Sequence, residues 1–261
     1  VMQHLLVDLG GKPFPAIIEE SVLRPLEMAH SSYEYPLPSA LAEKASTGHS
    51  QDGEPVKGKW RIYPEAAASG LWTTPSDIAL FALEVTKTGR GESQKVISPR
   101  LAREMLTPQF INKGLGVFVD DKDDDLNFNL RGHSEGFEAY MIVYPAKGQG
   151  VVIMINSDNG SFLVNEILRG ISVVYKWPHF RPLVKALFKL SPSVYQQYVG
   201  KYEVRPDYVL NVTHEDYYLV IQPTGQAPTK FYVETETSFF SADPYIHIHF
   251  VIEKGAVTGL V

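Results

Sequence analysis

The spacing of hydrophobic residues changes along the chain and predicts two structurally different parts. Up to about residue 177, apolar residues recur at helical spacing or gather in short runs. Two runs, Tyr140–Tyr144 and Val151–Ile155, are rich in Val, Ile and Tyr and flank a link containing Pro and Gly, which predicts a hairpin of two buried strands. We interpret residues 178–193 as the boundary between two domains. We therefore expect one domain over residues 1–180 and a second over residues 191–261.

The second part is predicted to be a small all-β module, either a sandwich or a barrel, because its runs are short and alternating. The predicted strands are Tyr208–Val212, Tyr217–Ile221, Phe231–Val233, Ser238–Ser241, Ile246–Ile252 and Val257–Val261.

Local signals predict several helices and two further strands in the first part. Thr74-Pro75 and Ser98-Pro99 are helix starts, and Asp77 strengthens the first of them. The other predicted helices are Val1–Leu9, Phe14–Met28 with a break near Pro25, and one capped by Ser161 with an apolar face of Leu163, Ile167, Ile171 and Val174. In the helix that starts at Ser98-Pro99, the residues expected to point inward are Leu101, Met105 and Leu106. The two further strands are predicted at Leu115–Val119 and Leu126–Leu130. Residues 30–64 lack periodicity, and connections this long are often functional.

Composition narrows the function classes. The chain has 261 residues, 44% of them hydrophobic, a net charge of −6 and no cysteine. The negative charge argues against nucleic acid and anionic membranes as partners. Without cysteine there are no disulfides, no thiolate catalysis and no zinc–sulfur site. We expect no cofactor and no transmembrane segment, and the oligomeric state stays open.

Candidate chemistry gathers in the Gly-flanked patch Gly132–Gly136. Its sequence, Gly-His-Ser-Glu-Gly, matches the G-x-S-x-G nucleophile elbow of α/β-hydrolases, which needs a helix directly after the serine. The residues after Gly136 are aromatic and β-branched, which favours a strand and disfavours the elbow. Two weaker patterns are interpreted as structural: Asp120–Asp125 as a solvated turn without the spacing of a calcium loop, and His247-Ile-His249 as an exposed strand face.

Four segments together follow the sequence pattern of one enzyme family. Gly11–Phe14 with Leu23–Met28 is similar to its "GKPF…PLGM", and Gly70–Ala79 is similar to "GGLWSTAxDLA". Gly132-His133-Ser134 with Gly136-Phe137 resembles its third active-site box. The tail from Tyr198 resembles a lipocalin-like domain appended to some members. On these segments the chain resembles the serine β-lactamase-related family: class C β-lactamases, D-alanyl-D-alanine carboxypeptidases and related esterases.

The resemblance implies an α+β fold: an antiparallel sheet with flanking helices, incomplete at the N-terminus, followed by a small barrel-like β domain. It also implies acyl transfer, in which a serine attacks the carbonyl of a small-molecule or peptide substrate, with a Lys and a Tyr handling protons and a strand-edge N–H binding the oxyanion. His133 and Ser134, in the third box, are expected to orient the substrate and tune charge. A periplasmic or extracellular location is the family-level expectation.

The chain departs from the family pattern at the catalytic residues. No serine is followed by a lysine three positions later, so the nucleophile motif S-x-x-K is absent, and so is the Tyr-x-Asn box. The third box is shortened, because Ser134 runs directly into Glu135-Gly136. We expect the nucleophile to come from chain preceding Val1, so that these residues alone are not catalytic. Two alternatives stay open: an inactive relative that acts as a binding or regulatory module, and an α/β-hydrolase that uses Ser134.

Overall fold

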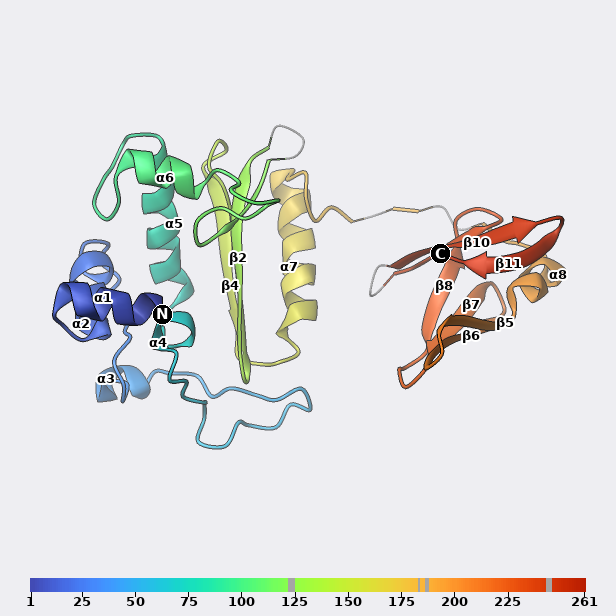
Figure 1. The fold of residues 1–261 in the computed structure, drawn as a ribbon, viewed down its shortest axis with the longest axis horizontal. Helices are drawn as coiled ribbons and strands as arrows, with labels where there is room; N and C mark the ends of the chain where they lie inside the picture. The colour runs from blue at the N-terminus through green and yellow to red at the C-terminus, as the bar shows by residue number, and fades with distance from the viewer. Residues whose placement is uncertain (122–124, 183, 186–187, 243–245) are drawn as a thin grey trace. The chain divides into compact units, whose positions relative to one another are not determined.

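The computed structural model describes residues 1–121, 125–182, 184–185, 188–242 and 246–261. These divide into two compact units, Val1–Pro182 and Leu183–Val261, and each is described by itself (Figure 1). Part of the predicted acidic turn, residues 122–124, lies outside the described residues.

The first unit begins with two short helical segments. Helix α1 spans Met2–Gly10 and ends at Gly11, whose φ of 61° is readily adopted only by glycine. Helix α2, Phe14–Ile18, continues as a π-helical turn, η1, over Glu19–Leu23. The predicted break near Pro25 is confirmed, because the helical segment ends at Leu23 and the proline ring cannot be accommodated inside a helix. The residues from Pro25 to Met28, predicted as part of the same helical stretch, are not helical.

The long connection after residue 29 contains one short helix, α3 (Ser39–Ala42), and leads to α4 (Ala66–Ser69). Helix α5, Pro75–Gly89, starts as predicted: the Thr74 side chain accepts a hydrogen bond from the backbone N–H of Asp77. Helix α6, Pro99–Met105, is capped in the same way by Ser98.

A four-stranded antiparallel sheet forms the middle of the first unit, with strand order β1-β2-β3-β4. The strands are β1 (Phe118–Asp120), β2 (Asn127–Ser134), β3 (Phe137–Tyr144) and β4 (Gln149–Ile155), and helix α7 (Gly160–Tyr175) follows. The predicted hairpin is β3–β4, whereas the predicted strand from Leu115 starts only at Phe118. The polar patch Gly132–Ser134 is part of β2, a strand longer than its apolar residues indicated.

Helices α5 and α7 cover opposite faces of this sheet (Figure 1). Because successive strand residues point to opposite faces, each strand contributes to two cores. One core contains Ala82 and Val85 of α5 with Val119, Phe128, Met141 and Val143; the other contains Val164 and Leu168 of α7 with Ile142, Tyr144, Ile153 and Trp177.

Three details of the predicted helix faces were wrong. Helix α7 buries Val164, Leu168 and Ser172, whereas Leu163 and Val174 are 53% and 72% exposed. Its N-cap position is Asn159, so Ser161 lies inside the helix. In α6, Leu101 is 40% exposed, although Met105 and Leu106 pack against the core as predicted.

The second unit is the predicted β module, a seven-stranded antiparallel, barrel-like sheet with strand order β11-β10-β9-β8-β7-β6-β5. Helix α8 (Pro192–Tyr195) and a 3₁₀ turn, η3 (Gln196–Tyr198), precede the strands β5 (Gly200–Arg205), β6 (Tyr208–Glu215), β7 (Tyr218–Pro223), β8 (Thr229–Val233), β9 (Ser238–Ser241), β10 (Ile246–Glu253) and β11 (Ala256–Leu260). Strand β5, whose residues are mostly exposed, was not predicted from the sequence. Aromatic side chains dominate the core, with Tyr195, Tyr198, Phe239 and Phe250 almost fully buried.

The predicted fold class is confirmed: the first unit has an antiparallel sheet with flanking helices, and the second is a barrel-like β unit. The lipocalin likeness and the domain limits at residues 180 and 191 stay predictions. Within the described residues, no helix combines the length and apolar character needed to cross a membrane.

Candidate functional site

A cavity of about 770 Å³ opens in the first unit between the helical segments and one end of the sheet. Its volume lies in the range of small-molecule sites, about 300–1,000 Å³. The strand wall carries Gly132, His133 and Ser134; the facing wall carries parts of the long connection, among them Trp60 and Tyr63. Both residues singled out in the sequence, His133 and Ser134, thus line the cavity together with the segment predicted to be functional.

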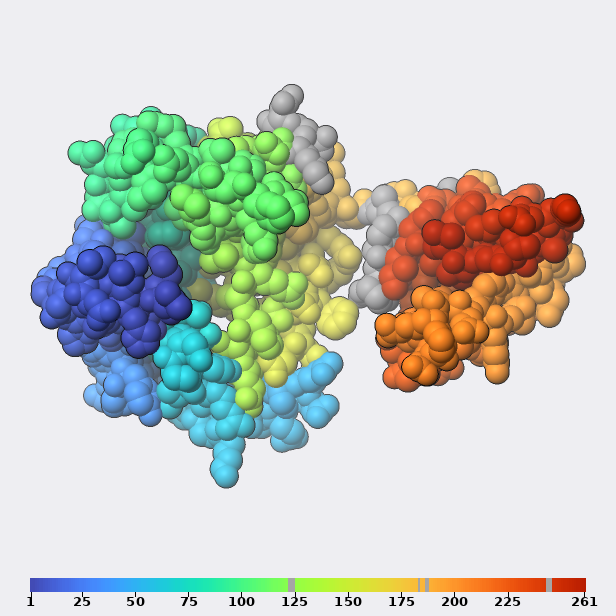
Figure 2. Space-filling view, in the orientation of Figure 1, coloured from blue at the N-terminus to red at the C-terminus, as the bar shows by residue number. Residues whose placement is uncertain are grey.

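The strand that carries these residues has a free outer edge. Strand β1 pairs with β2 only from Asn127 to Asn129, so from Leu130 to Ser134 no strand among the described residues pairs with the outer side of β2. A strand edge of this kind offers backbone N–H and C=O groups to a ligand. Figure 2 shows the yellow-green end of β2 at the surface beside the cyan segment around α4.

His133 and Ser134 point to opposite faces of the sheet. Ser134 lies opposite Phe137 in the register, on the face that carries Met141 toward α5. His133 lies opposite Glu138, on the face that carries Ile142 toward α7. The two residues therefore have different surroundings although they are neighbours in the sequence.

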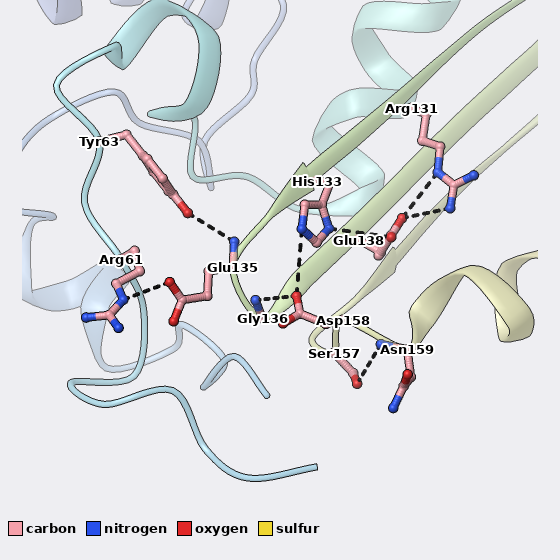
Figure 3. Close-up of polar contacts among 10 residues, drawn as sticks. All are labelled: Arg61, Tyr63, Arg131, His133, Glu135, Gly136, Glu138, Ser157, Asp158 and Asn159. Atoms are coloured by element: carbon pink, nitrogen blue, oxygen red, sulfur yellow. Dashed lines mark hydrogen bonds and ion pairs between the residues drawn. The ribbon is translucent and has the colours of Figure 1, made fainter. Parts of the chain in front are cut away.

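The His133 ring lies between two carboxylates (Figure 3). Its Nδ1 is 3.5 Å from Oε1 of Glu138, and its Nε2 is 3.9 Å from Oδ1 of Asp158. Glu138 is only 8% exposed, and its Oε2 accepts hydrogen bonds from Nε and Nη2 of Arg131 at 3.3 and 3.2 Å. Each ring nitrogen therefore lies within ion-pair distance of a carboxylate oxygen, and the side chain is 57% exposed.

The two-residue turn after Ser134 is held on several sides (Figure 3). The backbone N–H of Gly136 donates to Oδ1 of Asp158 at 2.7 Å, and that of Glu135 donates to the Tyr63 hydroxyl at 3.0 Å. The Glu135 carboxylate accepts a hydrogen bond from Arg61 at 2.8 Å. Because β3 follows this turn directly, the helix that a nucleophile elbow needs is not at this position.

Gly136 is required by both conformation and space. Its φ is +84°, and a Cβ atom there would lie 2.7 Å from Cγ2 of Val56 and 2.8 Å from the Cα of Gly48. The backbones of Gly136 and Gly48 therefore approach each other closely. It brings the long connection against the tip of the β2–β3 hairpin.

The remaining polar groups of the cavity limit its chemistry. Burial raises the pKa of Tyr140 to about 12, and the nearby Arg131 offsets this only in part, so the phenol stays protonated at neutral pH. Among the described residues, no group of three or more His, Asp or Glu side chains could hold a metal ion. His247 and His249 are exposed on β10, as predicted. The arrangement combines a cavity with a strand edge whose backbone groups can bind a ligand.

Sequence reasoning missed the groups that support His133 and Ser134. Glu138 could have been found from the two-residue turn, which places it opposite His133. Asp158 and Arg61 have no such local signal, because Asp158 is separated from Gly136 by 22 residues and Arg61 from Glu135 by 74.

Comparison with known proteins gives one family and a set of similar folds. The family model described as beta-lactamase matches residues 1–173. The chain is similar to the octameric penicillin-binding protein homologue from Pyrococcus abyssi (15% identity, 96% of this chain and 59% of that one, TM-score 0.57). It is also similar to SurE, with 19% identity over 97% of this chain and 62% of that one and a TM-score of 0.54. A penicillin-binding protein from Bacillus halodurans is similar with 18% identity over 64% of this chain and 51% of that one and a TM-score of 0.52.

At these identities the structures support the fold alone. The chain spans 59% of the Pyrococcus abyssi protein and 62% of SurE. No curated protein sequence matches it significantly.

Proposed function

Since the chain belongs to the β-lactamase family, we propose that it is part of a serine hydrolase that forms an acyl-enzyme on an amide, a β-lactam or an ester. The family motif S-x-x-K does not occur in its 261 residues. The attacking serine and its lysine are therefore proposed to come from a further segment of polypeptide. In this proposal the chain supplies the opposite wall of the active site.

One observation carries the proposal: the outer edge of β2 is free from Leu130 to Ser134 where it borders the cavity. A substrate laid along this edge can exchange backbone hydrogen bonds with it, and an outward N–H can stabilise the developing oxyanion. Ser134 would contact the substrate on the cavity face. His133, which lies between Glu138 and Asp158, would tune the charge on the other face.

The test is labelling of the natural full-length gene product with a fluorophosphonate and with a fluorescent penicillin. We expect a covalent serine adduct within an S-x-x-K peptide, and no adduct on the 261-residue chain alone. Absence of any serine adduct in the full-length product would overturn the catalytic proposal.

Ser134→Ala separates this proposal from the α/β-hydrolase alternative. If Ser134 only orients the substrate, the variant still becomes labelled, with a slower rate. Complete loss of labelling in a folded Ser134→Ala protein, with the adduct on Ser134 in the wild type, would favour the elbow mechanism instead.

A second candidate function, a binding or regulatory module that keeps the fold without the chemistry, is favoured by the absent S-x-x-K motif and the shortened third box. It predicts binding of acyl or peptidoglycan-type ligands by the full-length product without turnover. Measurable hydrolysis of nitrocefin or p-nitrophenyl esters would exclude it.

A further inference from the structure

Three aromatic rings from separate segments meet at the cavity wall beside Ser134. The ring centroids of Trp60 and Trp72 are 4.7 Å apart with an interplanar angle of 65°, and those of Trp72 and Phe137 are 6.1 Å apart at 83°. All three line the cavity and none is fully buried. We call them the aromatic trio.

The backbone holds each member of the trio in place. Phe137 opens β3 directly opposite Ser134. Trp72 exchanges backbone hydrogen bonds of 2.9 Å in both directions with Ser32. Trp60 lies between Lys59, whose carbonyl accepts from Gly48, and Arg61, which pairs with Glu135. The rings are thus presented by three anchored segments, which reduces the entropy that a ligand must offset.

The trio is on the same face of the sheet as Ser134, whereas the carboxylates of Glu138 and Asp158 contact His133 on the other side. Of the charged neighbours of the trio, Arg61 and Glu135 are paired with each other at 2.8 Å, and Nζ of Lys59 lies 6.0 Å from the centroid of the Trp60 ring. An uncharged ring stacked or set edge-on against this wall would gain aromatic contacts. A carboxylate there would be desolvated against the rings while Arg61 is already paired with Glu135. A cation would compete with the ammonium of Lys59, which already lies over the Trp60 ring.

We infer that the aromatic trio is a specificity pocket for an aromatic side chain next to the carbonyl group of the substrate. The inference rests on the proposed function for the position of that carbonyl, beside the free edge of β2. It specifies the substrate class as amides or esters whose group next to the carbonyl is apolar and ring-sized.

Equilibrium binding tests the pocket without requiring catalysis. The probes are N-acetylphenylalanine methylamide and N-acetylalanine methylamide, each as both enantiomers, titrated into the 261-residue chain. Two of its three tryptophans belong to the trio, so tryptophan emission reports the binding. We expect at least one phenylalanine enantiomer to bind roughly tenfold more tightly than its alanine counterpart, since loss of a matching apolar group costs about that much discrimination.

Variants assign the preference to the trio. Trp60→Ala is expected to reduce the ratio of the two affinities at least about fivefold, and Trp60→Phe, which keeps a ring, is expected to restore most of it. Phe110→Ala is the matched control, because Phe110 is an exposed aromatic residue of the same unit that is not part of the cavity wall.

The inference is overturned if the wild-type chain binds neither probe, if it binds both equally, or if Phe110→Ala lowers the ratio as much as Trp60→Ala. The outcome is separate from that of the labelling experiment. Loss of covalent labelling with intact ring selectivity would refute the catalytic proposal and leave the pocket, and labelling without ring selectivity would do the reverse.

Discussion

The contact between Gly136 and Gly48 makes a quantitative prediction about the hairpin that carries Ser134. Replacing Gly136 by Ala introduces a side chain at φ +84° and places its Cβ 2.7 Å from Val56 and 2.8 Å from the backbone of Gly48. The left-handed conformation costs about 1–2 kcal/mol for a non-glycine residue. Crowding in a packed region adds about 1–3 kcal/mol. We expect Gly136→Ala to lower the free energy of unfolding of the first unit by roughly 2–5 kcal/mol.

Gly148→Ala is the matched control. Gly148 has a φ of +62° in the neighbouring hairpin link, and a Cβ there would meet no atom within 4 Å. It therefore carries the conformational cost without the crowding. The stabilisation that alanine brings by restricting the unfolded chain is common to both variants and cancels in the comparison. The difference between them, about 1–3 kcal/mol, isolates the contact.

Urea unfolding followed by tryptophan emission measures this difference. Trp60, Trp72 and Trp177 all lie in the first unit, so the signal reports that unit. We expect the midpoint of Gly136→Ala to fall well below that of Gly148→Ala, with similar slopes. Equal midpoints for the two variants would refute the close approach of the long connection to the hairpin tip.

Further predictions concern buried polar and apolar groups. Glu84→Ala should cost at least about 3 kcal/mol in urea unfolding, because buried Glu84 accepts hydrogen bonds from Ser93, Thr88 and the backbone of Lys95. Burial alone would raise the pKa of Glu84, but these hydrogen bonds hold it below its usual range. Its stabilisation is therefore present above the unfolded-state pKa of about 4.3 and is lost as the pH falls through the lower folded-state value, so Glu84→Gln should flatten that part of an acid-stability profile. Asp77→Ala should cost about 2–3 kcal/mol, with Asp77→Asn milder, because Oδ2 accepts from the N–H of His30 and the hydroxyl of Ser31 at 2.8 and 2.7 Å. Phe250→Ala, at a fully buried position, should cost about 3–5 kcal/mol in the second unit, measured by amide hydrogen exchange of β5–β11; unchanged protection would contradict the packing described.

The elements that the sequence predicted well are those whose signals are local. The start of α5 depends on Thr74, Pro75 and Asp77, which act within one turn of the helix. The β3–β4 hairpin follows from two apolar runs and the link between them. In both cases the residues that decide the structure are close together in the chain.

Predictions failed where the local pattern was ambiguous. The first turns of helix α7 contain Phe162, Leu163 and Val164 in succession, so an apolar residue is available on several sides and periodicity alone cannot choose the buried one. Only packing against Ile142 and Tyr144 selects Val164 and leaves Leu163 exposed. Strand β2 extends into polar residues because β3 pairs with it as far as Ser134. The side chains from Leu130 to His133 are exposed, so burial does not impose an alternating apolar pattern on them.

The site itself depends on contacts that no short segment encodes. The motif Gly132-His133-Ser134 gave the location, but strand alternation separates its two side chains: Ser134 faces the side of the aromatic trio, and His133 faces Glu138 and Asp158. A single motif thus contributes to two environments, one apolar and one acidic. The long connection supplies Trp60 to the first, and the turn after β4 supplies Asp158 to the second. His49 of the long connection is hydrogen-bonded through its backbone to both the β2–β3 turn and the turn after β4. Its N–H donates to the carbonyl of Gly136, and its carbonyl accepts from the N–H of Asp158. Displacement of the long connection would therefore alter both environments together, although its residues and those of the motif are far apart in the sequence.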